Sequence, residues 1–185
     1  TDYSGINNWS ALNTDFQINS SGYLTNSTSL PVGTYYLNIT AEDPYSNNNS
    51  ATIYINITDT TNPQFTYIPE NTTLEYYTQP LAVDFNATDN NQIHTYFTND
   101  TRFIINNSGF LRNNSLLAVG TYYLTISVND TQSNTNSTVY KVQVQDTTPT
   151  PITQSYDITQ GYNTNIFADF NATDYSGIQD WYADN

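Results

Sequence analysis

The sequence predicts an all-β protein made of tandem β-sandwich modules, with about seven short strands in each module. Three observations support this fold class. The chain of 185 residues repeats itself at intervals of 87 and 85 residues, its apolar runs alternate with period two, and turn-forming residues separate those runs. Alternation of this kind is typical of strands with one buried face. Because no segment shows a sustained period of 3.6 residues, we expect essentially no helix.

The repeat extends over almost the whole chain. The motif Thr-Asp-Tyr-Ser-Gly-Ile at 1–6 returns in altered form at 88–93 and unchanged at 173–178. The segment 30–37, Leu-Pro-Val-Gly-Thr-Tyr-Tyr-Leu, returns at 117–124 with a single change. Self-similarity at the length of one domain indicates an array of like modules stacked along one chain.

The strand faces follow from the alternation. The clearest strand, 121–128, is predicted to direct Tyr122, Leu124, Ile126 and Val128 inward. Four further sets share this parity: Tyr35, Leu37, Ile39 and Ala41; Ile53, Ile55 and Ile57, which match Tyr140, Val142 and Val144; Leu81, Val83, Phe85 and Ala87; and Ile166, Ala168, Phe170 and Ala172. Side chains at the intervening positions should face solvent.

Turn residues such as Gly22 and Gly33 separate the strands about every 8–12 residues. Roughly seven short strands in a repeat of 85–87 residues is the pattern of an immunoglobulin-like sandwich. Trp9, Tyr96 and Trp181 occupy the place of the large aromatic residue of its third strand. Since the chain has no cysteine, this residue should pack on aliphatic side chains rather than on a disulfide.

The Asp-Thr-Thr segments at 59–61 and 146–148 are natural linkers between modules, because each closes a strand just before a proline. We therefore expect a complete module at 60–146, with its first strand in 65–77. Residues 1–59 would be the C-terminal part of a module without its first two strands, and 147–185 the N-terminal part of the next.

These two end segments are complementary parts of one sandwich. Either the chain continues past both ends, or neighbouring chains exchange strands. Residues 173–185 repeat the role of 1–13, so that strand exchange would supply the third strand twice. This redundancy favours a continuous array.

Composition excludes several functions. The net charge of −14 comes from 17 acidic residues against three basic ones, which argues against nucleic acids and anionic membranes as partners. No apolar run approaches the roughly 20 residues of a membrane-spanning helix, and no signal peptide is visible. The polar bulk is neutral, with 27 Asn, 30 Thr and 15 Ser, but 17 Tyr in alternating runs oppose disorder.

Three motifs carry a family resemblance. They are Phe-Asn-Ala-Thr-Asp at 85–89 and 170–174, Val-Gly-Thr-Tyr-Tyr-Leu at 32–37 and 119–124, and Val-Gln-Asp-Thr-Thr-Pro at 144–149. The chain resembles the cadherin-like and bacterial immunoglobulin-like tandem repeats of large surface proteins, above all of archaeal cell-surface glycoproteins. The resemblance implies an extracellular or cell-surface location and a role in stalks, adhesins or filaments.

The acceptor pattern for N-glycosylation, Asn-X-Ser/Thr, is abundant. About seven copies are expected from this content of Asn, Ser and Thr, whereas 14 occur. They are at Asn8, Asn19, Asn26, Asn38, Asn48, Asn56, Asn71, Asn86, Asn99, Asn106, Asn113, Asn129, Asn136 and Asn171. Chance in an Asn- and Thr-rich chain is the alternative. However, Asn38, Asn56, Asn86, Asn129 and Asn171 have the outward parity of their strands, where a glycan leaves the core intact.

The resemblance to cadherins also implies calcium between modules, held by an acid at the end of one module and by two loops of the next. The corresponding residues are Asp59 with Asp89 and Asp130, and Asp146 with Asp174. The acidic Leu-Asp-Arg-Glu element of that family is absent, and these aspartates have an alternative role as turn formers.

We expect no catalytic residue and no other cofactor. His94 is the only histidine, and it has no counterpart in the other copies of the repeat. The favoured function is a structural segment of an extracellular, N-glycosylated rod or filament, with copies of itself as partners. One alternative is an adhesin or carbohydrate-binding module using exposed tyrosines such as Tyr36, Tyr54 and Tyr123. Another is a spacer within a large extracellular enzyme.

Overall fold

The computed structural model describes residues 5–78, 80–152 and 157–183. These residues form strands, turns and coil without any helix, so the predicted all-β fold class is confirmed. Within the same residues there is accordingly no helix long and apolar enough to span a membrane. The chain divides into two compact units, Thr1–Thr61 (unit 1) and Asn62–Asn185 (unit 2).

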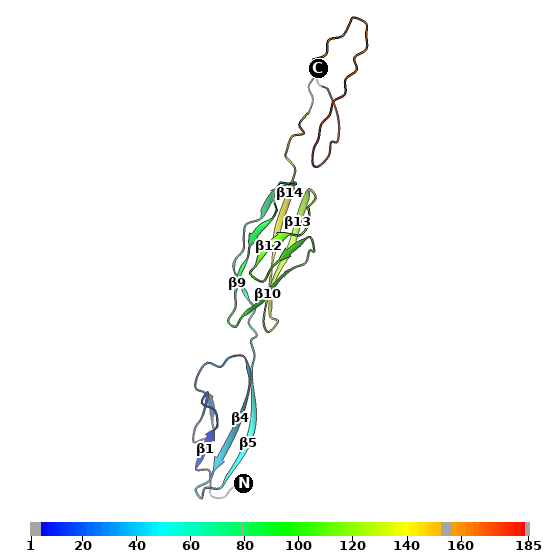
Figure 1. Ribbon diagram of the computed structural model, residues 1–185. Helices are drawn as coiled ribbons and strands as arrows, with labels where there is room; N and C mark the ends of the chain where they lie inside the picture. The colour runs from blue at the N-terminus through cyan, green and yellow to red at the C-terminus, as the bar shows by residue number, and fades with distance from the viewer. Residues whose placement is uncertain (1–4, 79, 153–156, 184–185) are drawn as a thin grey trace. The chain divides into compact units, whose positions relative to one another are not determined.

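From residue 5 onward, where the structure describes it, unit 1 contains five strands in two small antiparallel sheets (Figure 1). They are β1 (Asn8–Ala11), β2 (Phe16–Ile18), β3 (Leu24–Asn26), β4 (Gly33–Glu42) and β5 (Asn48–Ile57). The long strand β4 lies between β1 and β5, whereas β2 pairs with β3. Leu37 of β4 lies opposite Ile53 of β5, so the two inward faces coincide as predicted.

The interior of unit 1 is only partly covered. Leu37 is fully buried, and the ring of Phe16 meets the edge of the Tyr35 ring at a centroid distance of 5.7 Å. Ile53 was predicted to face inward, yet 36% of its side chain is exposed. The alternation therefore fixes the direction of the β5 side chains but does not bury all of them.

The described residues of unit 2 form nine strand segments. They are β6 (Gln64–Tyr67), β7 (Thr72–Glu75), β8 (Ala82–Asp84), β9 (Asn86–Thr88), β10 (Ile93–Thr98), β11 (Phe103–Ile105), β12 (Phe110–Asn113), β13 (Gly120–Asp130) and β14 (Thr135–Gln145). The predicted first strand is split into β6 and β7, and the second into β8 and β9. With each of these pairs counted as one strand, the module has the seven predicted strands.

Unit 2 is a sandwich of two layers. One layer has the strand order β10-β13-β14-β7, and the other contains the sheets β11-β12-β8 and β6-β9. Figure 1 shows β13 and β14 running alongside β10. The first strand crosses from one layer to the other: β6 pairs antiparallel with β9, and β7 then pairs parallel with β14. Pro69 lies at this crossing, where its missing N–H interrupts the ladder without loss.

The core of unit 2 contains the residues predicted from alternation. Leu81, Phe85, Tyr96, Leu124, Ile126, Val128, Tyr140, Val142 and Val144 are all buried in one cluster, and Val83 packs against it. The rings of Phe85 and Tyr140 meet edge to face at 5.2 Å. The hydroxyl of Tyr140 bonds to that of Thr72 at 2.6 Å, which satisfies the polar tip of this buried ring.

The segment after β14 contains no named strand among its described residues. A single antiparallel bridge joins Ile152 to Ala172, the counterparts of Phe65 and Ala87, which pair between β6 and β9. Ile166, Phe170 and Trp181, predicted to be inward-facing, are exposed here. By the sequence repeat, this segment of unit 2 is the counterpart of β6 to β9 and of the start of β10.

Candidate calcium and glycosylation sites

Asp130 ends β13 and organises the loop to β14. Only 1% of it is exposed. Its Oδ1 accepts the backbone N–H groups of Gln132 and Asn134, both at 2.8 Å, and its Oδ2 accepts Asn134 Nδ2 at 2.7 Å. Ser133 takes a positive φ of 70° within this loop. The carboxylate thus supplies acceptors for a tight turn, as aspartates commonly do.

Asp43 repeats this arrangement between β4 and β5 of unit 1. Its Oδ1 accepts the N–H groups of Tyr45 and Asn47, both at 2.8 Å, and its Oδ2 accepts Asn47 Nδ2, also at 2.8 Å. Ser46 has a φ of 66°, close to that of its counterpart Ser133. Asp43 was not among the predicted site residues, although its spacing of 87 residues from Asp130 marks it as the repeat counterpart.

Asp89 follows β9 and lies beside Asp130. One carboxylate oxygen of each residue lies within 4.8 Å of the other's. Asp89 Oδ2 accepts the N–H of Asn91 at 2.9 Å, whereas Asp89 Oδ1 is buried and has no hydrogen-bond partner among the described residues. The Oδ1 of Asn129 is also buried and also has no hydrogen-bond partner among the described residues. Buried oxygens without donors, next to a second carboxylate, have the chemistry expected of a site for a hard cation.

Asp59 is the last acidic residue of unit 1. It is buried, and its Oδ1 accepts the N–H of Thr61 at 2.9 Å, which turns the chain toward the linker. Asp146 occupies the equivalent place after β14, and its Oδ1 accepts the N–H of Thr148 at 3.1 Å. The two linkers therefore use the same Asp-X-Thr turn.

Asp174 lies within reach of the Asp146 carboxyl group. Hydrogen bonds from the hydroxyl and N–H of Ser176, at 2.6 and 2.8 Å, lower the pKa of Asp174. Weaker contributions from Thr150 and from the carboxyl group of Asp146 act in the same direction. Asp146 and Asp174 are the counterparts of Asp59 and Asp89 in the repeat.

The asparagines of the glycosylation patterns differ in accessibility. Eleven of them are exposed: Asn8, Asn19, Asn26, Asn38, Asn48, Asn56, Asn71, Asn86, Asn99, Asn106 and Asn171. Asn113, Asn129 and Asn136 are half-buried. The outward parity predicted for Asn129 thus does not make it freely accessible, because its Oδ1 is buried near Asp130. Asn136 donates through Nδ2, the atom that would carry a glycan, to the carbonyl of Pro63 at 2.9 Å.

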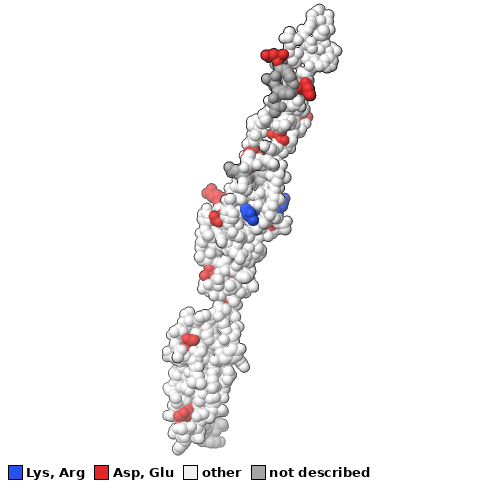
Figure 2. Space-filling view, in the orientation of Figure 1, with Lys and Arg blue, Asp and Glu red and all other residues white. Residues whose placement is uncertain are grey.

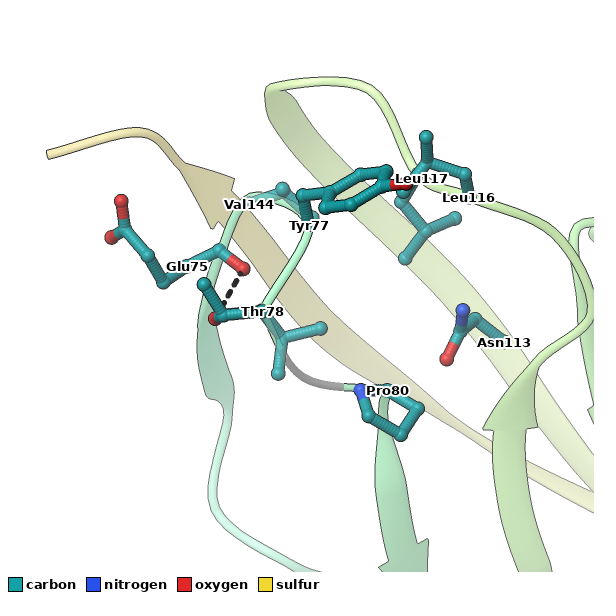
Figure 3. Close-up of a pocket in the computed structure, with 9 residues that line it drawn as sticks. Glu75, Tyr77, Thr78, Pro80, Asn113, Leu116, Leu117 and Val144 are labelled. Carbon is teal, nitrogen blue, oxygen red and sulfur yellow. Dashed lines mark hydrogen bonds between the residues drawn. The ribbon is translucent and has the colours of Figure 1, made fainter. Parts of the chain in front are cut away.

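A pocket of about 290 Å³ lies in unit 2 near the end of β14 (Figure 3). Leu74, Leu117 and Val144 contribute apolar walls to it. Figure 3 shows the Glu75 carboxylate directed away from the pocket. That carboxylate instead accepts the N–H of Thr147 at 2.6 Å, which lowers the pKa of Glu75. The described lining therefore has no pair of carboxylates directed at a common substrate position.

Charged side chains are sparse on the surface drawn in Figure 2. Acidic groups are scattered over that face, and the basic ones belong to unit 2, which holds Arg102, Arg112 and Lys141. Arg102 forms an ion pair with Asp100 at 2.5 Å and stacks over the Tyr122 ring at 4.5 Å. The guanidinium of Arg102 is therefore held by contacts with Asp100 and with the Tyr122 ring on β13.

Comparisons with known proteins give a result at the level of the fold. A scan against protein-family models finds no match, and no curated protein matches the sequence. Among solved structures, Drosophila N-cadherin EC1-3 superposes with a TM-score of 0.52 at 15% identity, covering 74% of this chain and 53% of that one. The fold is cadherin-like.

Other cadherin ectodomains match with lower scores. Mouse cadherin-23 EC22-24 gives a TM-score of 0.43 at 22% identity, covering 75% of this chain and 52% of that one. The human desmocollin-1 ectodomain gives 0.41 at 19% identity, with coverage of 77% and 35%. The chain spans about half the length, or less, of these cadherin structures. The predicted resemblance to cadherin-like repeats is confirmed as a fold.

Proposed function

We propose that this chain is a non-catalytic structural segment of an extracellular, N-glycosylated rod or filament built from tandem sandwich repeats. One observation carries the proposal: the same fold pattern recurs along one chain, with matching linkers and matching hairpin loops. The Asp43 and Asp130 loops share every hydrogen bond described above, across a spacing of 87 residues. An array of this kind extends by adding units and needs no chemistry.

We propose further copies of the same repeat as partners, in a continuous array or along a filament. Unit 1 supports this idea through its edges. In unit 2, β7 pairs with β14 and β8 pairs with β12. Among the described residues of unit 1, β5 and β3, the counterparts of β14 and β12, have no such neighbours. Strands equivalent to β7 and β8 would satisfy these edges and cover the exposed inward face of β5.

We propose calcium as the ion of the linkers. Asp89 and Asp130 of unit 2 would supply ligands of one site, to which the family resemblance adds Asp59, and Asp146 with Asp174 would supply part of the next. The buried, unpartnered Oδ1 of Asp89, close to the Asp130 carboxylate, fits a hard cation better than an empty turn. Calcium requires about six to eight oxygens, so backbone carbonyls and water would complete the shell. When bound, the ion would neutralise the clustered carboxylates and order the linker between modules.

We also propose that this chain is N-glycosylated. The eleven exposed acceptor asparagines are the first candidates, and Asn113, Asn129 and Asn136 are the least accessible. A coat of neutral sugar would keep a surface with so few Lys and Arg side chains in solution. Mass spectrometry of glycopeptides, on chain secreted from a glycosylating host, should show occupancy of the exposed set. A chain without N-glycans would contradict the proposed N-glycosylation.

A second candidate function is carbohydrate binding in an adhesin. The observation in its favour is the exposed pair Tyr36 and Tyr54 on β4 and β5, whose rings lie 5.0 Å apart. A glycan array probed with enzymatically deglycosylated chain separates the two candidates. Selective binding lost in Tyr36→Thr would favour the adhesin, and no binding would favour the structural role.

The structural function itself can be tested by small-angle X-ray scattering of the 185-residue chain with calcium and with a chelator. We expect a greater maximum dimension and a narrower distance distribution in calcium, because ordered linkers hold successive units in line. An identical, compact distribution under both conditions would contradict a calcium-stiffened rod.

A further inference from the structure

The outer face of the β4–β5 hairpin carries two exposed tyrosines side by side. Tyr36 is 65% exposed and Tyr54 is 71% exposed. They are direct cross-strand partners, and their rings meet edge to face with an interplanar angle of 84°. The faces of both rings are therefore exposed to water, which is unfavourable for apolar area, and a group that covered them would remove that cost.

The same short motif brings a glycosylation acceptor next to each tyrosine. β4 contains Tyr36-Leu37-Asn38-Ile39-Thr40, and β5 ends with Tyr54-Ile55-Asn56-Ile57, which Thr58 follows. Residues two apart on a strand share a face, so each asparagine lies on the same side of the sheet as its tyrosine. Asn38 and Asn56 are both exposed.

The antiparallel register places the tyrosine pair between the two asparagines. Asn38 lies opposite Thr52, and Asn56 lies opposite Thr34, with the tyrosine pair midway. The two asparagines are thus about 14 Å apart along the strands, and each is about 7 Å from the nearest tyrosine position. Asn56 accepts a hydrogen bond from Thr34 Oγ1 at 3.3 Å through Oδ1, and not through the nitrogen at which a glycan is attached.

We propose that Tyr36 and Tyr54 form a stacking platform for the first sugar residues of N-glycans on Asn38 and Asn56. This inference rests on the proposed N-glycosylation. The β-linked sugar at an N-glycosylation site presents a face of C–H groups, which complements the negative face of an aromatic ring. Stacking would remove apolar area of both tyrosines from water and would fix the glycans against the sheet.

Unit 2 supplies an internal control, because it lacks both halves of this arrangement. Tyr123 is the counterpart of Tyr36, but its cross-strand partner is Lys141. The positions equivalent to Asn38 and Asn56 are Thr125 and Gln143, neither of which can carry an N-glycan. The paired tyrosines and the paired acceptors therefore occur together in unit 1 and are absent together from unit 2.

The test uses the full chain secreted from a glycosylating host, with glycopeptide mass spectrometry and NMR of the sugar protons. We expect Asn38 and Asn56 to be occupied and their first sugar protons to be shifted upfield by the aromatic rings. The double variant Tyr36→Thr/Tyr54→Thr should abolish the upfield shift. Threonine keeps the strand propensity, and Tyr123→Thr is the matched control that should leave the sugars unchanged.

Enzymatic removal of the glycans provides a readout without any substitution, since the ring resonances of Tyr36 and Tyr54 should then shift while that of Tyr123 does not. Occupied sites whose sugar protons lack the shift, or keep it in the double variant, would overturn the stacking and leave the glycosylation standing. Unoccupied Asn38 and Asn56 would overturn both.

Discussion

Unit 1 and unit 2 share one strand pattern, but they bury it to different extents. Ile55 on β5 is partly exposed, whereas its counterpart Val142 on β14 is fully buried. Unit 2 contains the segments β6 to β9, which supply a second layer and a partner for β14. The comparison separates two properties: alternation decides which way a side chain faces, and the opposing layer decides whether that side chain is buried.

This difference has an energetic consequence. Apolar burial contributes about 25 cal/mol per Å² of area removed from water. Unit 1 has Phe16 and Leu37 as its buried apolar side chains among the described residues, whereas unit 2 has a cluster of 14. We therefore expect unit 1 to unfold first, in a separate transition.

The largest effect should come from truncating the same position in both units. Ile126 is fully buried in unit 2, and its counterpart Ile39 in unit 1 is only half-buried. Ile126→Ala should lower the free energy of unfolding of unit 2 by about 2–5 kcal/mol, because it leaves a cavity. Ile39→Ala should lower that of unit 1 by about 1 kcal/mol, because less area is lost. Urea unfolding of each variant measures both, and equal losses would contradict the difference in burial.

A second matched pair tests the turns before β3 and β12. Gly22 and Gly109 have φ values of 78° and 85°, so alanine is strained at both, by about 1–3 kcal/mol. At Gly109 an added Cβ would also overlap the carbonyl oxygen of Phe85, whereas at Gly22 the nearest atom is in the Trp9 ring, at 3.2 Å. Gly109→Ala should therefore lower the melting temperature of unit 2 more than Gly22→Ala lowers that of unit 1.

Calcium should sharpen the comparison, since Asp89 and Asp130 both belong to unit 2. Calcium at about 100 times its Kd should stabilise unit 2 by about 2.7 kcal/mol, and a chelator should reverse the gain. Asp89→Asn should weaken the response, whereas Asp84→Asn, an equal charge change at an exposed residue of β8, should not. Differential scanning calorimetry measures the melting temperature of unit 2 with calcium and with chelator. An unchanged melting temperature would indicate that the aspartates only form turns.

The smallest effect concerns acidity at the end of β7. The N–H of Thr147 holds the pKa of Glu75 below its ordinary value. Because this folded-state pKa is depressed, the contribution is present above the unfolded pKa of about 4.3 and is lost as the pH falls through the folded value. Hydrogen exchange at the Thr147 amide should lose protection there. Glu75→Gln should weaken that pH dependence, and an unchanged profile would contradict the role of the carboxylate.

Much of the fold was predictable because the side-chain period of a strand is local information. The inward direction of Leu124, Ile126 and Val142 followed from alternation, and the second layer of unit 2 then buries them. The pairing of Asp146 with Asp174 came from the family resemblance and not from this period. The repeat itself made each prediction testable at two places in one chain.

Other features depend on information that is not local. In the first strand, β6 pairs with β9 and β7 pairs with β14, and this change of partner depends on the other strands. Within residues 65–77, Pro69 is the one sequence feature that indicates it. The parity of β13 likewise does not predict the half-burial of Asn129, whose cross-strand neighbours are Thr95 and Thr135. Ile53 is partly exposed although Leu37 lies opposite it in the predicted register.

The parallel pairing of β7 with β14 determines how unit 2 would respond to tension. A force that pulls the chain entering at Asn62 away from the chain leaving after Gln145 slides these two strands past each other. The hydrogen bonds of the ladder from Thr72–Val142 to Glu75–Gln145 are then loaded together in shear, and do not open one at a time. The bonds from Thr147 and Thr148 to the Glu75 carboxylate share the same load. The β7–β14 pairing would thereby act as a mechanical clamp at the exit of the module.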